Sequence, residues 1–428
     1  MEARLSRPHP LLAVCLALAA CDSSAPPLAT TAAPAPLAKP ASTDELKGLA
    51  KSSNAFGLDF YGKVRSRKGN LVMSPFSLST ALAMTWAGAR GETAAQMAKV
   101  LHLDGPVDRT LDLCGSLVAS YGAPDQGVTV HIANRLFGEK TYAFEQPYLA
   151  RLKSAFGAPI EPIDFKRGAE DGRKRINAWI EGETHGRIND LIPTSGVSER
   201  TRLALVNAIY FLGDWAAPFN KDHTAPAPFF TSKSEKKDVP TMHQQEHFHF
   251  AATDGVEVLE MPYQNGALAM DLVLPDAVDG LDAVEARLTP AVFEQWMGAA
   301  SSATVSVSLP RVEIAPAEPL ALADTLSALG MPLAFDAGKA DFTGIGNAPN
   351  PEERLFLSKV VHKAFLKIDE KGTEAAAATA ALPVAAGISR VALVPKEFRA
   401  DHPFLFFLRD VRSGLVLFMG RVADPAGK

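Results

Sequence analysis

One short stretch, HQQEH at residues 243–247, combines residue types and spacing that could do chemistry. Two histidines four residues apart, with a glutamate between them, match the H-x-x-E-H pattern of inverted zinc proteases. That chemistry needs both histidines on one face of a helix, so that a single zinc ion reaches them. The stretch instead follows Val239-Pro240 and runs into HFHF, an alternation typical of a strand. In a strand the two histidines would lie roughly 13 Å apart, at about 3.3 Å per residue, so we expect no metal site here.

The chain contains no other assembled catalytic motif. A G-x-S-x-G nucleophile elbow, a P-loop and a G-x-G-x-x-G turn are all absent from the sequence. With 428 residues, of which 47% are hydrophobic and 21% charged, the chain can bury a sizeable core. A net charge of -5, with only short basic clusters, argues against nucleic acid as a partner. We therefore expect a protein that is not an enzyme and that carries no cofactor.

The first 42 residues have the composition of an export signal followed by a tether. Arg4 and Arg7 precede an apolar run that is too short for a membrane span of roughly 20 residues, so residues 1–20 resemble a secretory signal. The run ends at Cys21 in a pattern that resembles a bacterial lipobox, which implies that this cysteine carries a lipid. Ordinary signal cleavage beside an incidental cysteine is the alternative. Residues 21–42, rich in Ala, Pro, Ser and Thr, are expected to form a flexible tether.

The cysteine content is compatible with a lipidated, exported protein. Only Cys21 and Cys114 remain after removal of the signal, so a lipid on Cys21 leaves no pair to form an intramolecular disulfide. We expect a monomeric cell-envelope lipoprotein that is anchored to a membrane through Cys21. Its folded domain would lie in the periplasm or outside the cell.

Residues 43–425 have the pattern of one folded domain, because no second linker and no internal repeat interrupts them. Helices are expected first, in a segment that is capped by Thr43 and runs to Lys63, and at residues 77–89 and 91–101. Strands are expected afterwards, at residues 128–137, 204–213, 256–263, 267–275, 304–314, 404–410 and 415–422. Helices followed by many strands predict an α+β fold with large sheets.

The run TEAAAATAAL at residues 373–382 has three local interpretations. Thr373 could cap a helix with Glu374 at its positive end and alanines extending it. Its side chains are too small to hold such a short helix to a core, and isolated short helices are marginal in water, so an exposed loop is the second interpretation. In the third, the run becomes a strand, and one of its faces is small and uncharged. Such a strand could fit between two existing strands.

Several segments, taken together, resemble the serpin family. IDEKGTEAAAAT at residues 368–379 is similar to the hinge of inhibitory serpins, and LSKVVHKAFLKI at residues 357–368 resembles the strand before it. Further similar segments follow the family's order and bring the resemblance to about 380 residues: 70–84, 176–192, 203–219, 402–410 and 415–425. The resemblance, which we take to be to a bacterial lipoprotein form, implies a single domain of N-terminal helices and large mixed or antiparallel β-sheets. A reactive-centre loop would be exposed at about residues 370–400.

What the resemblance implies is an inhibitor that works by being attacked. A serine protease would cut the exposed loop and form an acyl-enzyme, and the freed loop would insert into the large sheet before water releases the protease. The partner would be that protease, held in a covalent complex. The implied hinge residues are Glu370, Gly372, Thr373, Ala375, Ala377 and Thr379. The implied residues beneath the opening sheet, called the shutter, are Ser74, Ser77, Asn207 and His362, and Trp215 would mark the breach where the loop first enters.

The scissile bond of inhibitory members usually lies 16 residues after the hinge glutamate. Counting from Glu370 predicts cleavage between Ala386 and Gly387. A small apolar residue at that position suits the shallow pockets of elastase-like or subtilisin-like proteases. The alternative is cleavage between Arg390 and Val391, which would direct the loop to trypsin-like proteases.

Two features of the loop depart from the family's pattern. The segment from Glu370 to Pro403 is several residues longer than in compact members, and we assign the excess to the C-terminal side of the cut. Pro383 lacks an N–H, so insertion is expected to stop or weaken near it.

Two other functions stay open at the level of sequence. A non-inhibitory serpin would act as a binding or structural protein. The predicted inserting face from Thr373 to Thr379 carries no proline, charge or bulky residue, which favours inhibition. A zinc hydrolase built on residues 243–247 would lose its activity to a chelator.

Overall fold

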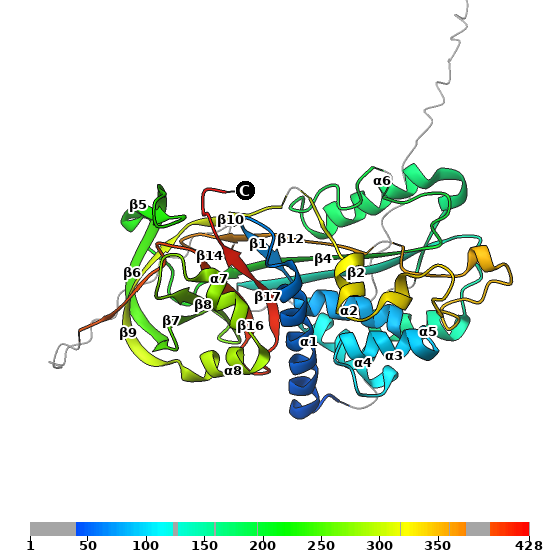
Figure 1. Ribbon diagram of the computed structural model, residues 1–428, viewed down its shortest axis with the longest axis horizontal. Helices are drawn as coiled ribbons and strands as arrows, with labels where there is room; N and C mark the ends of the chain where they lie inside the picture. Colours follow the sequence, from blue (N-terminus) through cyan, green and yellow to red (C-terminus); the bar gives the residue numbers. More distant parts are fainter. Residues whose placement is uncertain are drawn as a thin grey trace, which may run out of the picture. The chain divides into compact units, whose positions relative to one another are not determined.

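A computed structural model describes residues 40–122, 127–157, 160–194, 196–316, 318–358, 360–373 and 394–427 (Figure 1). All of them belong to one compact unit of the chain, Ala32–Lys428. Several predictions concern residues outside this set. They are the signal, lipidated Cys21 and most of the tether, together with Ala375, Ala377, Thr379 and both candidate reactive bonds, Ala386-Gly387 and Arg390-Val391.

The helices among the described residues are α1 Thr43–Val64, α2 Pro75–Trp86, α3 Gly91–Val100, α4 Val107–Gly122, α5 Gln146–Phe156, α6 Phe165–Glu183, α7 Leu281–Arg287, α8 Pro290–Ala299 and α9 Ala323–Leu329. Short 3-10 turns occur at η1 Lys221–His223, η2 Pro332–Phe335 and η3 Pro351–Glu353. None of these described helices is long and apolar enough to cross a membrane.

The start of α1 differs by one residue from the prediction. Ser42, and not Thr43, is the cap: its side chain accepts a hydrogen bond from the Glu45 N–H, and the Glu45 carboxylate accepts one from the Ser42 N–H. This reciprocal pair is a capping box. Arg109 also donates to the Pro40 carbonyl oxygen at 3.1 Å. The hydrogen bonds of the domain therefore begin at Pro40, three residues before the predicted boundary at residue 43.

A six-stranded sheet contains four of the predicted functional residues, Asn207, His362, Gly372 and Thr373. Its strands lie in the order β11-β12-β4-β2-β3, and β14 adds to β4. Their bounds are β2 Val128–Glu139, β3 Glu161–Ile163, β4 Leu203–Asp214, β11 Leu320–Ala321, β12 Val360–Ala364 and β14 Gly372–Thr373. The predicted strands at residues 128–137 and 204–213 are confirmed as β2 and β4.

The two faces of β4 pack against different layers because successive side chains of a strand point in opposite directions. Val206 and Ala208 lie in a cluster with Trp179 of α6, whereas Ile209 and Phe211 belong to a cluster that includes Phe76 of α2. Figure 1 shows α6 and α2 on either side of this sheet. β4 is therefore a central, buried strand.

A second, nine-stranded sheet has the order β1-β17-β16-β8-β7-β6-β9-β15, with β5 paired to β6. The bounds are β1 Leu71–Met73, β5 Ala225–Phe230, β6 Lys236–Thr253, β7 Val256–Pro262, β8 Leu268–Pro275, β9 Ser301–Pro310, β15 Lys396–Arg399, β16 Phe404–Asp410 and β17 Val416–Val422. A small third sheet pairs β10 Val312–Ile314 with β13 Leu366–Ile368. The predicted strand at residues 304–314 is thus two strands, divided at Arg311.

The HQQEH stretch lies within β6, as the alternation predicted. His243 Nδ1 is 2.9 Å from Ser308 Oγ on the neighbouring strand β9. In the part of the chain that the structure describes, no cluster of three or more His, Cys, Asp or Glu side chains is placed to hold a metal ion. The strand geometry contradicts the helical histidine pair that a zinc hydrolase needs.

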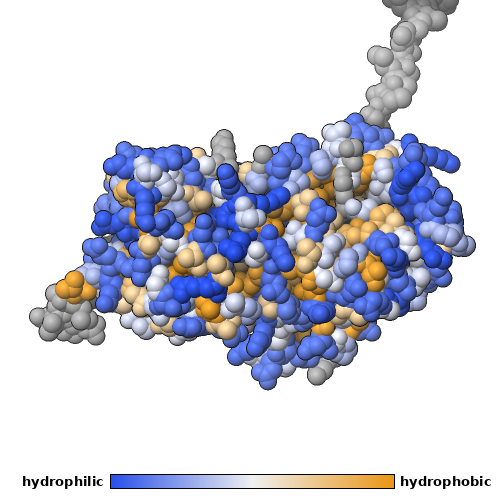
Figure 2. Space-filling model, viewed as in Figure 1, coloured by the Kyte–Doolittle hydropathy of each residue, from blue (hydrophilic) through white to orange (hydrophobic). Residues whose placement is uncertain are grey.

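The α+β class with large sheets is confirmed, but the predicted order of elements is only partly right. α7, α8 and α9 follow the strand β8, so helices are not confined to the N-terminal part. Figure 2 shows hydrophilic side chains spread over the face drawn there, with hydrophobic ones interspersed.

Candidate functional site

Four of the predicted residues form one buried polar cluster beneath the six-stranded sheet. His362 on β12 and Asn207 on β4 are direct partners in the parallel ladder, and His362 Nδ1 is 2.6 Å from Asn207 Oδ1. The Ser74 N–H donates to His362 Nε2 at 3.0 Å, and the Asn207 amide donates to the Ser77 carbonyl oxygen at 2.9 Å. All four residues are fully buried. The cluster therefore connects α2 to both strands.

The protonation of His362 follows from its partners. Because Nε2 accepts from Ser74, the ring hydrogen lies on Nδ1 and is donated to Asn207. Burial disfavours the imidazolium and lowers the pKa of His362 to about 3. The ring is therefore neutral at physiological pH, and its bond to Asn207 must break if β4 and β12 separate.

β12 pairs with only part of β4. The parallel ladder runs from Val360, opposite Leu205, to Ala364, opposite Ile209. Further along β4 the partner is β14, which runs antiparallel, with Gly372 opposite Asp214 and Thr373 opposite Gly213. The first residues of the predicted hinge thus already lie beside β4.

A tight turn reverses the chain before β14. Asp369 and Gly372 exchange backbone hydrogen bonds, at 2.8 Å from Asp369 N and 3.2 Å from Gly372 N. Gly372 has a φ of 155°, and a Cβ there would lie 1.9 Å from the Gly213 carbonyl oxygen. Only glycine fits, since the two backbones approach too closely for any side chain.

Trp215, the predicted breach residue, holds this turn from one side. Its indole N–H donates to the Asp369 carbonyl oxygen at 3.0 Å, and its backbone N–H donates to the Lys371 carbonyl oxygen at 2.7 Å. The ring is stacked on Tyr263, with centroids 4.5 Å apart and planes 17° apart. Tyr263 in turn places its hydroxyl 2.7 Å from Thr373 Oγ1.

Glu370 holds the turn from the other side. Its side chain is 3% exposed, and one carboxylate oxygen accepts from the Arg311 guanidinium and, at 2.6 Å, from the Thr224 hydroxyl. Its carbonyl oxygen accepts from the Phe219 N–H at 2.8 Å. Burial opposes ionisation, but the hydrogen bonds from Arg311 and Thr224 outweigh it and lower the pKa of Glu370. Glu370 is thus an ionised group fixed at the base of the predicted loop.

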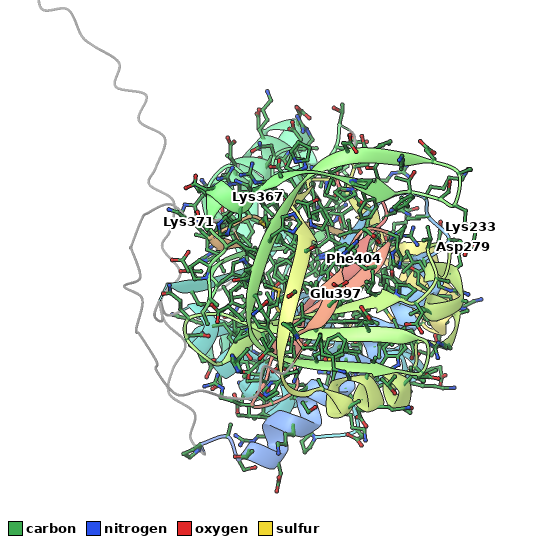
Figure 3. All side chains as sticks on the ribbon, turned by 90° about the vertical axis from the view of Figure 1, so that its left-hand side faces the viewer. Lys233, Asp279, Lys367, Lys371, Glu397 and Phe404 are labelled. Carbon is green, nitrogen blue, oxygen red and sulfur yellow. The ribbon has the colours of Figure 1, made fainter. Side chains whose placement is uncertain are left out.

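The end of the domain that carries this turn is drawn in Figure 3. Lys367 and Lys371, both half-buried, are labelled toward one edge of this view, whereas Phe404 is labelled near its centre and is fully buried. Lys367 forms an ion pair with Asp369 at 3.6 Å. The turn therefore lies at the surface, with its acidic Glu370 side chain directed inward.

The structure brings together Ser74, Ser77, Asn207 and His362 in one cluster and Glu370, Gly372, Thr373 and Trp215 in another. Their roles as shutter, hinge and breach stay predictions. Three residues that the sequence did not point to complete the second cluster: Thr224, Tyr263 and Arg311. Arg311 alone had a visible signal, since Pro310 before it interrupts the ladder of the single strand predicted at residues 304–314.

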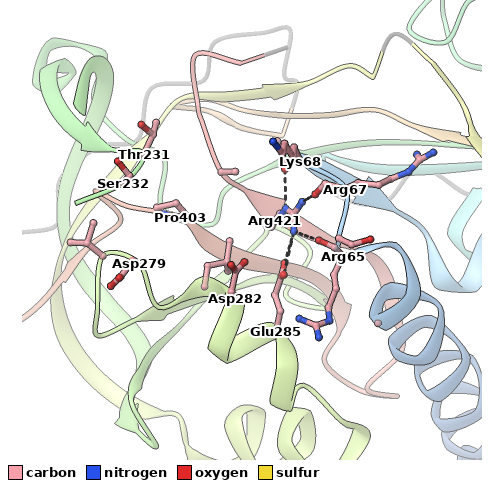
Figure 4. A pocket seen from close by; sticks show the side chains of 16 residues that line it. Arg65, Arg67, Lys68, Thr231, Ser232, Asp279, Asp282, Glu285, Pro403 and Arg421 are labelled. Atoms are coloured by element: carbon pink, nitrogen blue, oxygen red, sulfur yellow. Dashed lines mark hydrogen bonds and ion pairs between the residues drawn. The ribbon is translucent and has the colours of Figure 1, made fainter. Parts of the chain in front are cut away.

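A cavity of 660 Å³ lies elsewhere, between the end of α1, α7 and β17 (Figure 4). Arg421 at its wall donates to Glu285 at 3.0 Å and to the Gly69 carbonyl oxygen at 2.9 Å, and it also contacts the carbonyl oxygens of Arg65 and Arg67. These bonds fix the loop after α1 to β17 and α7. None of the predicted hinge, shutter or breach residues lines this cavity.

Comparison with known proteins places the fold in a family. The model of the family described as Serpin (serine protease inhibitor) matches residues 51–425, and the chain belongs to this family. Its similar members include an elastase inhibitor and a thyroxine-binding globulin. Leukocyte elastase inhibitor A of Rattus norvegicus is 39% identical over 390 residues, which cover 89% of this chain and all of that protein.

Solved structures agree with this assignment. Uncleaved ovalbumin has a TM-score of 0.78 at 29% identity, covering 88% of this chain and all of ovalbumin. Human thyroxine-binding globulin complexed with thyroxine also has a TM-score of 0.78, at 26% identity, covering 90% of this chain and all of the globulin. The fold is therefore shared with family members whose names describe different activities.

Proposed function

We propose that the protein inhibits a serine protease by offering its loop as a substrate and inserting the cut loop beside β4. The observation that carries this proposal is the short strand β14, in which Gly372 and Thr373 already pair with Asp214 and Gly213. Similarity to an elastase inhibitor supports an elastase-like target, and so does the small apolar Ala386. The protease serine would attack the Ala386 carbonyl carbon, form an ester there, and release Gly387 as a new amino terminus.

Continuing the β14 register gives the geometry of the inserted strand. Antiparallel pairing that starts with Thr373 opposite Gly213 places Ala377 opposite Ile209 and Thr379 opposite Asn207. The first residue of β4, Leu203, would then lie opposite Pro383. Insertion is thus expected to use the whole of β4. It is expected to end at Pro383, which has no backbone N–H to donate to the ladder.

The inserted strand offers enough free energy to trap a protease. About ten residues would gain net hydrogen bonds of roughly 0.5–1.5 kcal/mol each, or on the order of 10 kcal/mol. A typical protease domain is stable by roughly 5–15 kcal/mol. The two quantities are comparable, so insertion can distort the protease before water hydrolyses the ester.

The test is incubation of the mature domain with pancreatic elastase, subtilisin and trypsin, followed by denaturing electrophoresis and mass mapping of the released peptide. We expect a complex that survives denaturation and a released fragment beginning at Gly387. A fragment beginning at Val391 would move the reactive residue to Arg390. Absence of such a complex with every protease would favour the alternative, a non-inhibitory binding protein.

We also propose that the protein is exported as a lipoprotein, is anchored to a membrane through Cys21 and acts at the cell envelope. The support is the apolar run that ends at this cysteine, followed by the Ala- and Pro-rich tether. The matched family region begins at residue 51, so it does not bear on this segment. Incorporation of labelled fatty acid into the full chain, and its loss in Cys21→Ser, is the expected result. Label retained in that variant would refute the anchor.

A further inference from the structure

Tyr263 is a buried side chain that reaches from the nine-stranded sheet to the hinge. It follows the last residue of β7 and forms an isolated bridge with Trp215, just beyond the end of β4. Its side chain is completely buried, and burial raises the pKa of its hydroxyl far above the ordinary value. The hydroxyl therefore stays protonated and can both donate and accept a hydrogen bond.

Three neighbours fix where this hydroxyl points. The ring is stacked on Trp215, and Phe211 packs edge-on against it with centroids 5.0 Å apart. A Cβ on Gly213 would lie 2.8 Å from the Tyr263 ring, so glycine at that position leaves room for the tyrosine beside β4. The hydroxyl is thus held 2.7 Å from Thr373 Oγ1, and Thr373 is itself fully buried.

We infer that Tyr263 is the positioning residue that sets the register of the inserting strand, by binding the Thr373 hydroxyl opposite Gly213 before cleavage. This inference rests on the proposed inhibitory function. A slip by one residue would turn Glu374 toward the buried face, because side chains alternate along a strand. A slip by two would bring Ala375, which has no hydroxyl to offer Tyr263. The hydrogen bond therefore distinguishes the correct register from both neighbouring ones.

The primary variant is Tyr263→Phe, which keeps the ring contacts and removes only the hydroxyl. Tyr148→Phe is the matched control, because the Tyr148 hydroxyl is also buried and makes one hydrogen bond, to the Met84 carbonyl oxygen, far from the hinge. Both variants lose one buried hydrogen bond, so a general loss of stability affects them alike. The readout is the ratio of cleaved, unbound inhibitor to denaturant-stable complex formed with pancreatic elastase.

We expect Tyr263→Phe to raise this ratio about 3- to 10-fold, the range of one net hydrogen bond, and Tyr148→Phe to leave it unchanged. Thr373→Val should match Tyr263→Phe, the double variant should be no worse than either, and Thr373→Ser should restore the wild-type ratio. Equal ratios for Tyr263→Phe and Tyr148→Phe, or additive effects in the double variant, would overturn the inference. If Tyr263→Phe does not fold, the contrast between Thr373→Val and Thr373→Ser decides alone.

A second readout reports the register itself. In the correct register, cysteines placed at positions 377 and 209 lie opposite each other and can form a disulfide after cleavage, whereas positions 378 and 209 cannot. Tyr263→Phe should lower the disulfide yield of the 377/209 pair relative to that of the 378/209 pair. An unchanged relative yield would contradict the inference. If the wild-type protein forms no denaturant-stable complex at all, the proposed function fails, and that outcome differs from any change among the variants.

Discussion

Replacing Glu370 with glutamine tests whether the charged contact to Arg311 holds the base of the loop. The substitution keeps the shape of the side chain but removes its charge, so the hydrogen bonds from Arg311 and Thr224 lose their ionic character. Hydrogen bonds to charged groups contribute about 1.5–3 kcal/mol. The Arg311 side chain is 44% exposed, so water competes for it, and we expect a loss of about 1–2 kcal/mol in the free energy of unfolding.

The loss should depend on pH in a defined direction. The pKa of Glu370 is lowered in the folded protein, so its stabilising contribution is present above the unfolded pKa of about 4.3 and disappears as pH falls through the folded pKa. The difference between wild type and Glu370→Gln should therefore be full at pH 7 and shrink below about pH 4.

The assay is urea unfolding at pH 7 and at successively lower pH. Asp279→Asn is the control, because Asp279 pairs with Lys233 at 2.7 Å on the surface (Figure 3), where the two side chains are 53% and 71% exposed. Exposed pairs of this kind contribute little to stability, because water screens them. If Glu370→Gln loses no more than Asp279→Asn at pH 7, or if its deficit persists in acid, the ion pair does not hold the turn.

Three further predictions concern the loop and the cluster beneath the sheet. Thr373→Arg would bury a charge during insertion, so electrophoresis should show cleaved inhibitor in place of complex, and an unchanged complex yield would contradict insertion. His362 has a pKa lowered to about 3 by burial, so its contribution to stability is present above the unfolded pKa of about 6.5 and is lost as pH falls toward 3. Between pH 7 and pH 4 the free energy of unfolding should therefore decline less for His362→Gln than for wild type. Equal declines would refute the assignment of His362 as a buried, neutral imidazole. Ala386→Arg should redirect formation of the denaturant-stable complex from elastase to trypsin. If the wild-type protein already forms this complex with trypsin, and the substitution does not increase it, the reactive residue is Arg390 and not Ala386.

Local sequence patterns identified much of the scaffold because they depend only on neighbouring residues. Alternation located the strand that contains His243 and His247, and apolar runs located β2, β4, β7 and β8. The small, uncharged face of the run after Gly372 favoured a strand, and its first residue, Thr373, does pair with β4, as does Gly372 before it. The capping box at Ser42 was missed by one residue, although Glu45 three positions later was the visible signal.

The contacts that define the hinge could not be predicted in the same way. Thr224 and Glu370 are 146 residues apart, and Tyr263 and Thr373 are 110 apart. Nothing near Tyr263 in the sequence distinguishes it from any tyrosine that follows a strand. Such pairs arise only when two sheets meet, so the chain must be folded before the partner of either residue is visible.

Asn207 links the closed sheet to the inserted strand that we propose. Its amide nitrogen has two hydrogens but lies close to three acceptors, two on Ser77 and one on Asn134. Its carbonyl oxygen depends on His362, which would leave with β12. The continued register places Thr379 opposite Asn207, so the Thr379 hydroxyl can donate in place of the imidazole. Because one donor would replace another while the amide keeps its acceptors, the proposed inserted state would not leave the Asn207 carbonyl oxygen unpaired, and it would avoid the cost of a buried, unsatisfied acceptor.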